Sequence, residues 1–375
     1  MSKTERLLRE LIAIPSVNPA FLPPSHPHAG EQRISNYLKS IAERAGLEVE
    51  LKPVKDGRCN LVARLTPVGK IRKCIVLAPH LDTVNAEDAQ FTPSKRNGRI
   101  FGRGACDAKG SVAAMFSAVR ELGCSAKRPT HTEIVFAGLI DEENAQVGSL
   151  ALAASGLKAD LAIVGEPTRL QAVTAHKGNL WLRLQTRGKS AHGARPELGR
   201  NAVHAMARVV HLIETKYAAD LRRRKHPLLG CATVSVGVIR GGTQPNIVPD
   251  KCVIEIDRRT LPGETESRVR REIQSLLRAN DLSANIENGK TILCLPLETN
   301  PTVPLVAEFL RNVGQRNPVG VNYYCDASVF SRAGIPSLVF GPGDIAHAHT
   351  ANEWISVRSL ERAREMLLRF LRSLP

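Results

Sequence analysis

Aromatic residues make up only 4% of the 375 residues, so the chain offers few side chains on which nucleic-acid bases could stack. Eight cysteines are present, but no two of them form a Cys-x-x-Cys pair, and they are scattered along the whole length. This distribution argues against a zinc finger and against a disulfide framework. We interpret nearly all of them as small buried apolar residues. Cys106 is the one exception, because it stands beside a candidate metal ligand.

Long apolar runs are also missing. No segment approaches the roughly 20 consecutive apolar residues that a membrane-spanning helix needs. The first residues, MSKTERLLRELIAIPSVNP, contain neither the apolar core nor the small-residue cleavage site of a secretory signal. These absences favour a cytoplasmic protein without a membrane partner.

The charge is strongly of one sign. There are 52 Lys and Arg against 36 Asp and Glu, which gives a net charge of +16. Such a balance can indicate nucleic-acid binding, and that alternative predicts salt-sensitive binding to DNA or RNA. The basic residues are nevertheless spread out, and the one dense cluster, residues 222–225, follows a helical pattern and is typical of a solvated helix end. We therefore expect no nucleic-acid partner.

The chain length suits two domains. The first half and the end of the chain alternate short apolar runs, typical of buried strands, with helical patterns. The predicted strands are 74–78, 133–140, 161–164 and 337–340, and the predicted helices are 31–45, 110–122 and 356–374. This alternation indicates an α/β layer with helices on both faces of the sheet.

The segment 176–289 has a different pattern, because its predicted strands alternate apolar and polar residues. These strands are 180–186, 231–238 and 252–258, and predicted helices at 201–216 and 264–279 lie among them. Half-exposed strands with helices on one face indicate a small α+β domain. We therefore predict one domain formed by residues 1–175 and 290–375, into which residues 176–289 are inserted.

Acidic and imidazole side chains follow four of the predicted strands. They are His80 and Asp82, then Asp141, Glu142 and Glu143, then Glu166, and finally His349. Ligands of open α/β sheets bind outside the carboxyl ends of the strands, so these side chains should meet at one edge. Any one of them could be a solvated loop residue, but together they would repel each other unless a cation neutralised them.

Five residues form the candidate metal set: His80, Asp107, Glu143, Glu166 and His349. Asp107 precedes a predicted helix, so it either caps that helix or joins the set. Mixed nitrogen and oxygen ligands suit zinc, cobalt or manganese better than calcium. Five protein ligands exceed one open catalytic zinc site and fit two ions that share a bridging carboxylate. We expect two divalent ions per subunit, with zinc as the first choice and cobalt or manganese as alternatives.

Five motifs then occur in order along the chain. They are HLDTV at 80–84, GRGACDAKG at 102–110, DEE at 141–143, GEPT at 165–168 and AHTANE at 348–353. This ordered set resembles the co-catalytic metallohydrolases that include acetylornithine deacetylase, succinyl-diaminopimelate desuccinylase, aminoacylase and carboxypeptidase G. The resemblance covers essentially the whole chain. It implies a catalytic domain with a mixed, mostly parallel sheet flanked by helices, and an inserted α+β lid domain through which a homodimer forms.

The resemblance also implies a role for each metal ligand. His80 and Glu166 would bind one ion, Glu143 and His349 would bind the other, and Asp107 would bridge the two. The segment Ile345-Ala346-His347-Ala348-His349 contains two histidines, and either His347 or His349 could be the last ligand. The family pattern places the ligand directly before a short segment that ends in Asn-Glu or Asp-Glu, which selects residue 349.

Two further acids complete the implied catalytic machinery. Asp82 would accept a hydrogen bond from the ring of His80 and orient it. Glu142 would be the general base that activates a metal-bridging water and passes the proton to the leaving amine.

The inserted segment contributes the remaining candidate residues. GKSAHG at 188–193 resembles the family segment whose histidine reaches the active site of the partner subunit, so His192 would stabilise the oxyanion. Asn246 and Arg258 would hold the substrate, since a guanidinium can donate two hydrogen bonds to a carboxylate. The alternatives are an ordinary loop histidine for His192 and a surface strand residue for Arg258.

These motifs predict a metal-dependent hydrolase that cleaves the amide bond of an N-acyl amino acid, closest to acetylornithine deacetylase. The motif GEPT followed by AHKG at 175–178 motivates this choice. A dipeptidase or carboxypeptidase that acts on a short peptide, or a succinyl-diaminopimelate desuccinylase, fits the same motifs. A catalytically silent binding protein on the same fold is the non-enzymatic alternative, but such a protein would have little reason to retain Glu142.

Overall fold

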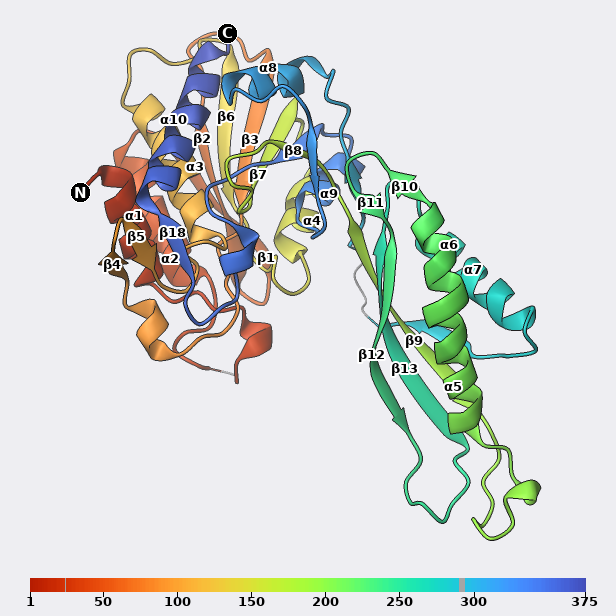
Figure 1. The fold of residues 1–375 in the computed structure, drawn as a ribbon. Coiled ribbons are helices and arrows are strands. Elements are labelled where there is room, and N and C mark those ends of the chain that lie inside the picture. The colour runs from red at the N-terminus through yellow and green to blue at the C-terminus, as the bar shows by residue number, and fades with distance from the viewer. Residues whose placement is uncertain (24, 290–293) are drawn as a thin grey trace. The chain divides into compact units, whose positions relative to one another are not determined.

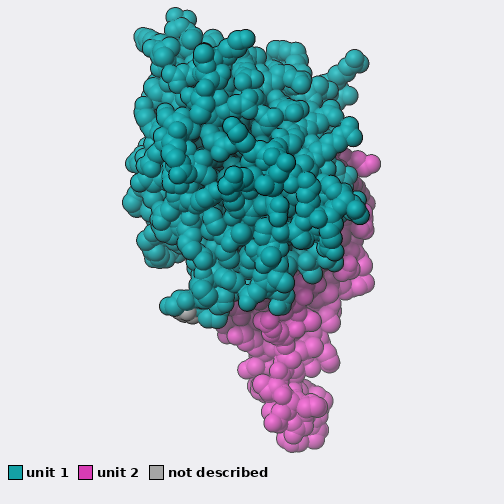
Figure 2. Space-filling view, turned by 90° about the vertical axis from the view of Figure 1, so that its left-hand side faces the viewer, with its two compact units in different colours: residues 1–174, 299–319, 325–375 teal, residues 175–298, 320–324 magenta. Residues whose placement is uncertain are grey.

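The structure, a computed structural model, describes residues 1–23, 25–289 and 294–375 (Figure 1). The chain divides into two compact units. Unit 1 contains Met1–Thr174, Thr299–Val319 and Cys325–Pro375, and unit 2 contains Ala175–Glu298 and Gly320–Tyr324 (Figure 2). The first change of unit lies beside the predicted boundary at residues 175 and 176. The predicted return at residue 290 lies outside the described residues, and the chain re-enters unit 1 at Thr299.

Unit 1 is built on a mixed sheet with the strand order β1-β2-β6-β3-β7-β17-β8. The strands are β1 (Glu48–Lys55), β2 (Arg58–Leu65), β6 (Thr132–Gly138), β3 (Lys73–Pro79), β7 (Leu161–Gly165), β17 (Ser337–Val339) and β8 (Val173–His176). The central strands β6, β3, β7 and β17 run parallel to one another, whereas β1, β2 and β8 pair antiparallel with their neighbours. The parallel strands correspond to the four apolar runs that the sequence predicted.

Helices cover both faces of this sheet, which explains why β3 and β7 are buried almost throughout. The helix α3 (Lys109–Gly123) connects β3 to β6 and packs with α1 (Lys3–Ile12) and α10 (Val357–Ser373). The helix α4 (Val147–Ala154) connects β6 to β7 in the opposite direction along the sheet and packs with α9 (Ala327–Arg332). Since both crossovers join parallel strands, right-handed connections place α3 and α4 on opposite faces.

Two further α-helices are described in unit 1: α2 (Gln32–Arg44), which packs on β1 and β2, and α8 (Pro304–Asn312), which packs on α10. Among the described residues, no helix combines the length and the apolar character needed to cross a membrane. The parallel arrangement has one consequence for function. The carboxyl ends of β6, β3 and β7 open onto the same edge, and the acidic motifs follow at that edge.

Unit 2 is organised around a four-stranded antiparallel sheet with the order β12-β13-β9-β14. The strands are β12 (Thr233–Gly241), β13 (Lys251–Thr260), β9 (Gly178–Arg187) and β14 (Asn285–Asn288). The helices are α5 (Ala202–Leu212), which continues through a π-helical turn into α6 (Ala218–Arg223), and α7 (Glu266–Arg278). In β13 buried and partly exposed residues alternate, so only one face of the sheet packs against the helices.

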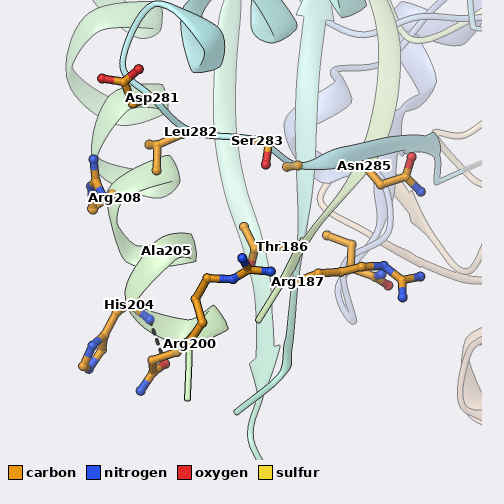
Figure 3. Close-up of a pocket in the computed structure, with 13 residues that line it drawn as sticks. Thr186, Arg187, Arg200, His204, Ala205, Arg208, Asp281, Leu282, Ser283 and Asn285 are labelled. Carbon is orange, nitrogen blue, oxygen red and sulfur yellow. Dashed lines mark hydrogen bonds between the residues drawn. The ribbon is translucent and has the colours of Figure 1, made fainter. Parts of the chain in front are cut away.

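A cavity of about 690 Å³ lies in unit 2 between the start of α5 and the loop that precedes β14 (Figure 3). Its lining includes Arg200 and Arg208, and Asp281 is the only acid among the described residues that line it. None of the candidate residues predicted in the inserted segment lines this cavity.

Candidate metal centre

His80 follows β3 directly, and its side chain is buried. Its Nε2 atom lies 3.1 Å from Oδ1 of Asp107 and 3.8 Å from Oε1 of Glu166. Its Nδ1 atom lies 3.0 Å from the carbonyl oxygen of Asp82 and 3.4 Å from that residue's Oδ1. Burial disfavours the charged ring, but hydrogen bonds to Asp107 and Asp82 raise the pKa of His80 well above its ordinary value. The ring therefore presents Nε2 to the acidic cluster, with Nδ1 held from behind.

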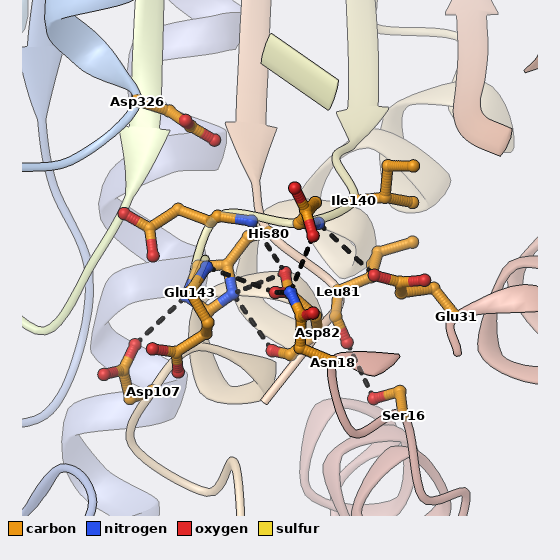
Figure 4. Close-up of polar contacts among 12 residues, drawn as sticks. Ser16, Asn18, Glu31, His80, Leu81, Asp82, Asp107, Ile140, Glu143 and Asp326 are labelled. Atoms are coloured by element: carbon orange, nitrogen blue, oxygen red, sulfur yellow. Dashed lines mark hydrogen bonds and ion pairs between the residues drawn. The ribbon is translucent and has the colours of Figure 1, made fainter. Parts of the chain in front are cut away.

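Asp82 holds more than the imidazole ring. Its Oδ1 accepts a hydrogen bond of 3.1 Å from the backbone N–H of Glu142, and its Oδ2 accepts one of 3.2 Å from that of Glu143. Asp82 is completely buried. One carboxylate therefore fixes the position of His80 relative to the loop that follows β6 (Figure 4).

His349 closes the cluster from the C-terminal part of the chain. Its Nε2 lies 3.1 Å from Oε1 of Glu143 and 3.2 Å from Oδ2 of Asp107. Hydrogen bonds to Asp107 and Glu143 raise the pKa of His349 to about 10. The neighbouring His347 instead packs on Trp354, with ring centroids 4.2 Å apart at an interplanar angle of 35°. The structure thus brings residue 349, and not residue 347, to the acids.

Glu142 and Glu166 form the other side of the cluster. Ligand atoms of His80, Glu142 and Glu166 lie within 4.8 Å of one another, as do those of His80, Asp107 and Glu143. Burial, and then the charge of Glu166, raise the pKa of Glu142 well above its ordinary value. The Oε1 atom of Glu166 is buried and has no hydrogen-bond partner among the described residues.

This arrangement passes the physical test for a metal site. Four buried or half-buried carboxylates face two imidazoles, and one carboxylate oxygen is orphaned in the interior. Divalent cations neutralise such a cluster and satisfy its free oxygen, and nitrogen with oxygen donors suit zinc, cobalt or manganese. All five predicted ligands therefore converge in unit 1.

Glu353 organises the loop that carries Asp107, a role that the sequence reading did not assign. Its Oε1 accepts hydrogen bonds from the backbone N–H groups of Cys106 (2.8 Å) and Asp107 (3.0 Å). Its Oε2 accepts from the N–H of Gly104 (3.1 Å) and from Nη1 of Arg103 (2.7 Å). Because Glu353 is only 1% exposed, this carboxylate acts as an internal clamp on the loop.

Asp326 is a second buried acid that the sequence reading missed. Its Oδ1 accepts hydrogen bonds from Oγ of Ser149 (2.6 Å) and Nε2 of Gln146 (3.0 Å). These partners stand at the start of α4, directly after the acidic loop. Burial raises the pKa of Asp326 to about 6. The contact ties the C-terminal segment of unit 1 to the turn that follows Glu143.

The Cys106 thiol, which the sequence left open as an exception, is buried and donates a hydrogen bond to the carbonyl oxygen of Asp344. Burial and the charges of Asp107 and Glu353 raise the pKa of the Cys106 thiol far above its ordinary value. The thiol therefore stays protonated, which is the state of an inert structural cysteine.

The candidate residues of unit 2 fall into two places. The loops of His192 and Asn246 are joined, because the N–H of Gly193 donates a 2.7 Å hydrogen bond to the carbonyl oxygen of Asn246. Arg258 lies towards the other end of β13 and is completely buried, so it is not a surface residue. Its Nη2 lies 2.7 Å from Oε1 of Glu264, and its Nε donates to the hydroxyl of Tyr217.

Comparison with known proteins yields a consistent set of similarities. Residues 76–373 match the model of peptidase family M20/M25/M40. The chain is 30% identical over 378 residues to acetylornithine deacetylase of Proteus mirabilis (strain HI4320), covering 96% of this chain and 94% of that protein. It is 32% identical over 357 residues to acetylornithine deacetylase of Myxococcus xanthus, covering 89% and 90%. The crystal structure of aminopeptidase PepT from Bacillus cereus superposes with a TM-score of 0.78 at 25% identity, covering 99% and 98% of the two chains.

Proposed function

The chain belongs to peptidase family M20/M25/M40, and on this premise we propose that it hydrolyses the amide bond of an N-acyl amino acid at a site with two divalent ions. The acetylornithine deacetylase relatives support metal-dependent amide hydrolysis, the reaction class that the motifs predicted. One observation carries the proposal. Two groups of ligand atoms share His80, and one of them contains Glu142 while the other contains Glu143.

The distances favour a division of the ligands between two ions. His80 and Glu166 would hold one ion, and Glu143 and His349 would hold the other. Asp107 would bridge them, and its distances support this role, because its Oδ1 lies 3.1 Å from Nε2 of His80 and its Oδ2 lies 3.2 Å from Nε2 of His349. Ions of this kind lower the pKa of water and polarise an amide carbonyl. We propose zinc first, with cobalt and manganese as alternatives, because the same donors bind all three.

Glu142 is the proposed proton carrier. The backbone of Glu142 is held by Asp82, and burial raises the pKa of the Glu142 carboxyl, which is the direction that favours a proton acceptor. Its carboxylate takes the proton of the attacking water and delivers it to the nitrogen of the leaving amine as the C–N bond breaks. The products are a carboxylic acid and a free amine.

A substrate panel tests the reaction and the substrate class. We expect hydrolysis of N-acetyl amino acids to exceed that of N-succinyl amino acids and dipeptides by about tenfold in kcat/KM, the scale on which a pocket discriminates small groups. The purified chain would be assayed by amine release with Zn²⁺, Co²⁺ or Mn²⁺, and chelation by EDTA should abolish turnover.

The same panel separates the alternatives. Turnover of dipeptides alone would move the assignment to a dipeptidase or carboxypeptidase, and the likeness to aminopeptidase PepT supports a peptide substrate in general. Preference for N-succinyl substrates would favour a desuccinylase. A chain that binds metal but hydrolyses nothing in the panel would favour a catalytically silent binding protein.

A homodimer is also proposed, with His192 of each subunit completing the site of the other. The residue is exposed, and its Nδ1 accepts a 3.1 Å hydrogen bond from the N–H of Ala194, which leaves Nε2 available as a donor. We expect His192→Ala to lower kcat by about 10²- to 10³-fold, the effect of removing an oxyanion donor.

Mixed dimers test whether that histidine acts across subunits. Subunits carrying His192→Ala and subunits carrying Glu142→Gln would each be inactive alone, but mixing them should restore activity. In such a dimer one site has both an intact base and an intact partner histidine. Absence of recovery, or a monomer in sedimentation, would remove His192 from the neighbouring site. Asn246 and Arg258 stay predictions as substrate-holding residues.

A further inference from the structure

Asp141 is the first acid of the Asp141-Glu142-Glu143 run, and it takes no part in the proposed metal set. Its backbone has a φ of 68°, in the left-handed region that residues with a side chain seldom adopt. Such a position persists only where surrounding groups hold it. Backbone contacts do part of this, because the carbonyl oxygen of Asp141 accepts hydrogen bonds from the N–H groups of Ala145 (3.1 Å) and Gln146 (2.6 Å).

The Asp141 side chain points to two donors away from the proposed ligands. Its Oδ1 accepts hydrogen bonds from Nη1 of Arg58 (3.0 Å) and from Nδ2 of Asn18 (2.9 Å). The second N–H of the Asn18 amide donates to Oδ2 of Asp82 at 2.8 Å, and Asn18 is completely buried. A single amide therefore joins the first residue of the acidic loop to the carboxylate behind His80. Figure 4 shows the contact between Asn18 and Asp82.

Asp82 completes the connection, because its oxygens accept the backbone N–H groups of Glu142 and Glu143. The loop that carries the proposed base, Glu142, and one proposed ligand, Glu143, is therefore held at both of its ends. Asp141 is held from the side of Arg58, and the two glutamates are held from the side of Asp82. Asn18 couples these two anchors.

Arg58 is the outer end of this network. It begins β2, its side chain is 16% exposed, and its Nε donates a 2.9 Å hydrogen bond to Oε2 of Glu31. Oε1 of Glu31 in turn accepts the backbone N–H of Asp141 at 3.3 Å. Arg58 thus meets two buried carboxylates, one of which belongs to the loop itself. A guanidinium suits this place, because its planar fork can serve two acids at fixed angles.

We propose that Arg58 is a positioning residue for the metal centre, which sets the Asp141–Glu143 loop through Asp141 and Asn18 without touching the reacting atoms. The inference rests on the proposed function, because that function assigns Glu142 as base and Glu143 as ligand. Loss of Arg58 leaves Asp141 and Glu31 buried without their cation, and the loop then relaxes from the position in which Glu143 meets His349.

Arg64 supplies a matched control. It lies on the same strand β2 and forms an ion pair of similar length, 3.0 Å, with Glu133 of β6. That pair lies at the opposite end of β2 from Arg58, because Arg64 pairs with Val135 near the start of β6, whereas the acidic loop follows the end of β6. If Arg58 only stabilised the fold, Arg58→Met and Arg64→Met would have the same Zn²⁺ affinity and the same kcat.

The test compares Arg58→Met, Arg58→Lys and Arg64→Met in the full chain. Zn²⁺ affinity would be measured by calorimetry, stability by thermal unfolding of the metal-free protein, and kcat and KM on the best substrate of the panel. We expect Arg58→Met to weaken Zn²⁺ binding and lower kcat by about 10- to 100-fold, the usual effect of removing a group behind the metal ligands, with KM little changed. Arg58→Lys should recover part of both, and Arg64→Met should change neither.

Equal Zn²⁺ affinity and kcat in Arg58→Met and Arg64→Met would overturn the inference and leave Arg58 as a stabilising ion pair only. If Arg58→Met does not fold, Asn18→Ala replaces it, since that change removes the amide that couples Asp141 to Asp82. Unchanged Zn²⁺ affinity in Asn18→Ala would overturn the inference equally. The Zn²⁺ titration needs no substrate, so a wild-type chain that hydrolyses no amide would refute the proposed function while this comparison stays decisive.

Discussion

Replacement of Glu142 by glutamine is expected to lower kcat by about 10²- to 10⁴-fold, the range that a positioned proton carrier contributes. The amide has nearly the same shape as the carboxylate, so Asp82 would still hold the Glu142 backbone and the fold would be kept. It cannot accept the proton of the attacking water. Steady-state kinetics on the preferred substrate, with metal content measured by mass spectrometry on the same samples, would give both quantities.

The adjacent residue provides the control for that experiment. Glu143 lies 3.1 Å from His349, so Glu143→Gln should lose metal as well as activity, whereas Glu142→Gln should keep its metal. The distinction matters because oxygen atoms of Glu142 also lie within reach of His80 and Glu166. Metal loss in Glu142→Gln would make that residue a ligand, and unchanged activity would remove it from the mechanism.

The central strands of unit 1 and most of the candidate metal ligands could be predicted from local sequence patterns. Four buried strands are recognised in the sequence as short apolar runs, and the residues that follow parallel strands lie at one edge of the sheet. His80, Glu143 and Glu166 come within a few residues of such ends, so their convergence needed no knowledge of long-range packing. The order of the motifs then gave the family, which the match over residues 76–373 confirms.

The groups that hold the ligands could not be predicted in the same way. Glu353 binds the backbone of a loop far earlier in the chain, and 247 residues separate it from its partner Cys106. Asn18 and Arg58 reach Asp141 across sequence separations of 123 and 83 residues. Hydrogen bonds to a carboxylate leave no periodicity in sequence, and an Asn, Arg or Glu occurs as readily on a solvated surface. The left-handed backbone of Asp141 has no sequence signal either.

The division into two units could be predicted from the sequence only in part. A change from continuous to alternating apolar patterns marks the entry into unit 2 near residue 175, because strand exposure changes there. The short return of Gly320–Tyr324 to unit 2 has no such mark. Five residues are too few to establish a period, and their membership depends on packing alone.

Replacement of His349 by alanine is expected to weaken metal binding by more than about 100-fold, beyond the effect of removing a group behind the ligands, and to abolish turnover with it. Its Nε2 lies beside the carboxylates of both Glu143 and Asp107. The substitution would therefore remove the nitrogen donor from this side of the proposed metal site. His347→Ala should keep both metal and activity, because that ring packs on Trp354. Equilibrium dialysis with Zn²⁺ would measure the binding.

The pH dependence of Zn²⁺ binding provides an independent test of whether His349 is a metal ligand. Asp107 and Glu143 raise the pKa of His349 to about 10, so at pH 7 an arriving ion displaces a proton from its ring. Zn²⁺ affinity of the wild-type chain should therefore fall as the pH is lowered from 8 to 6, by about tenfold per unit for each proton released. Calorimetry in buffers of different ionisation enthalpy would count the protons. His349→Ala should release fewer of them than His347→Ala, and the reverse order would assign the ligand to residue 347.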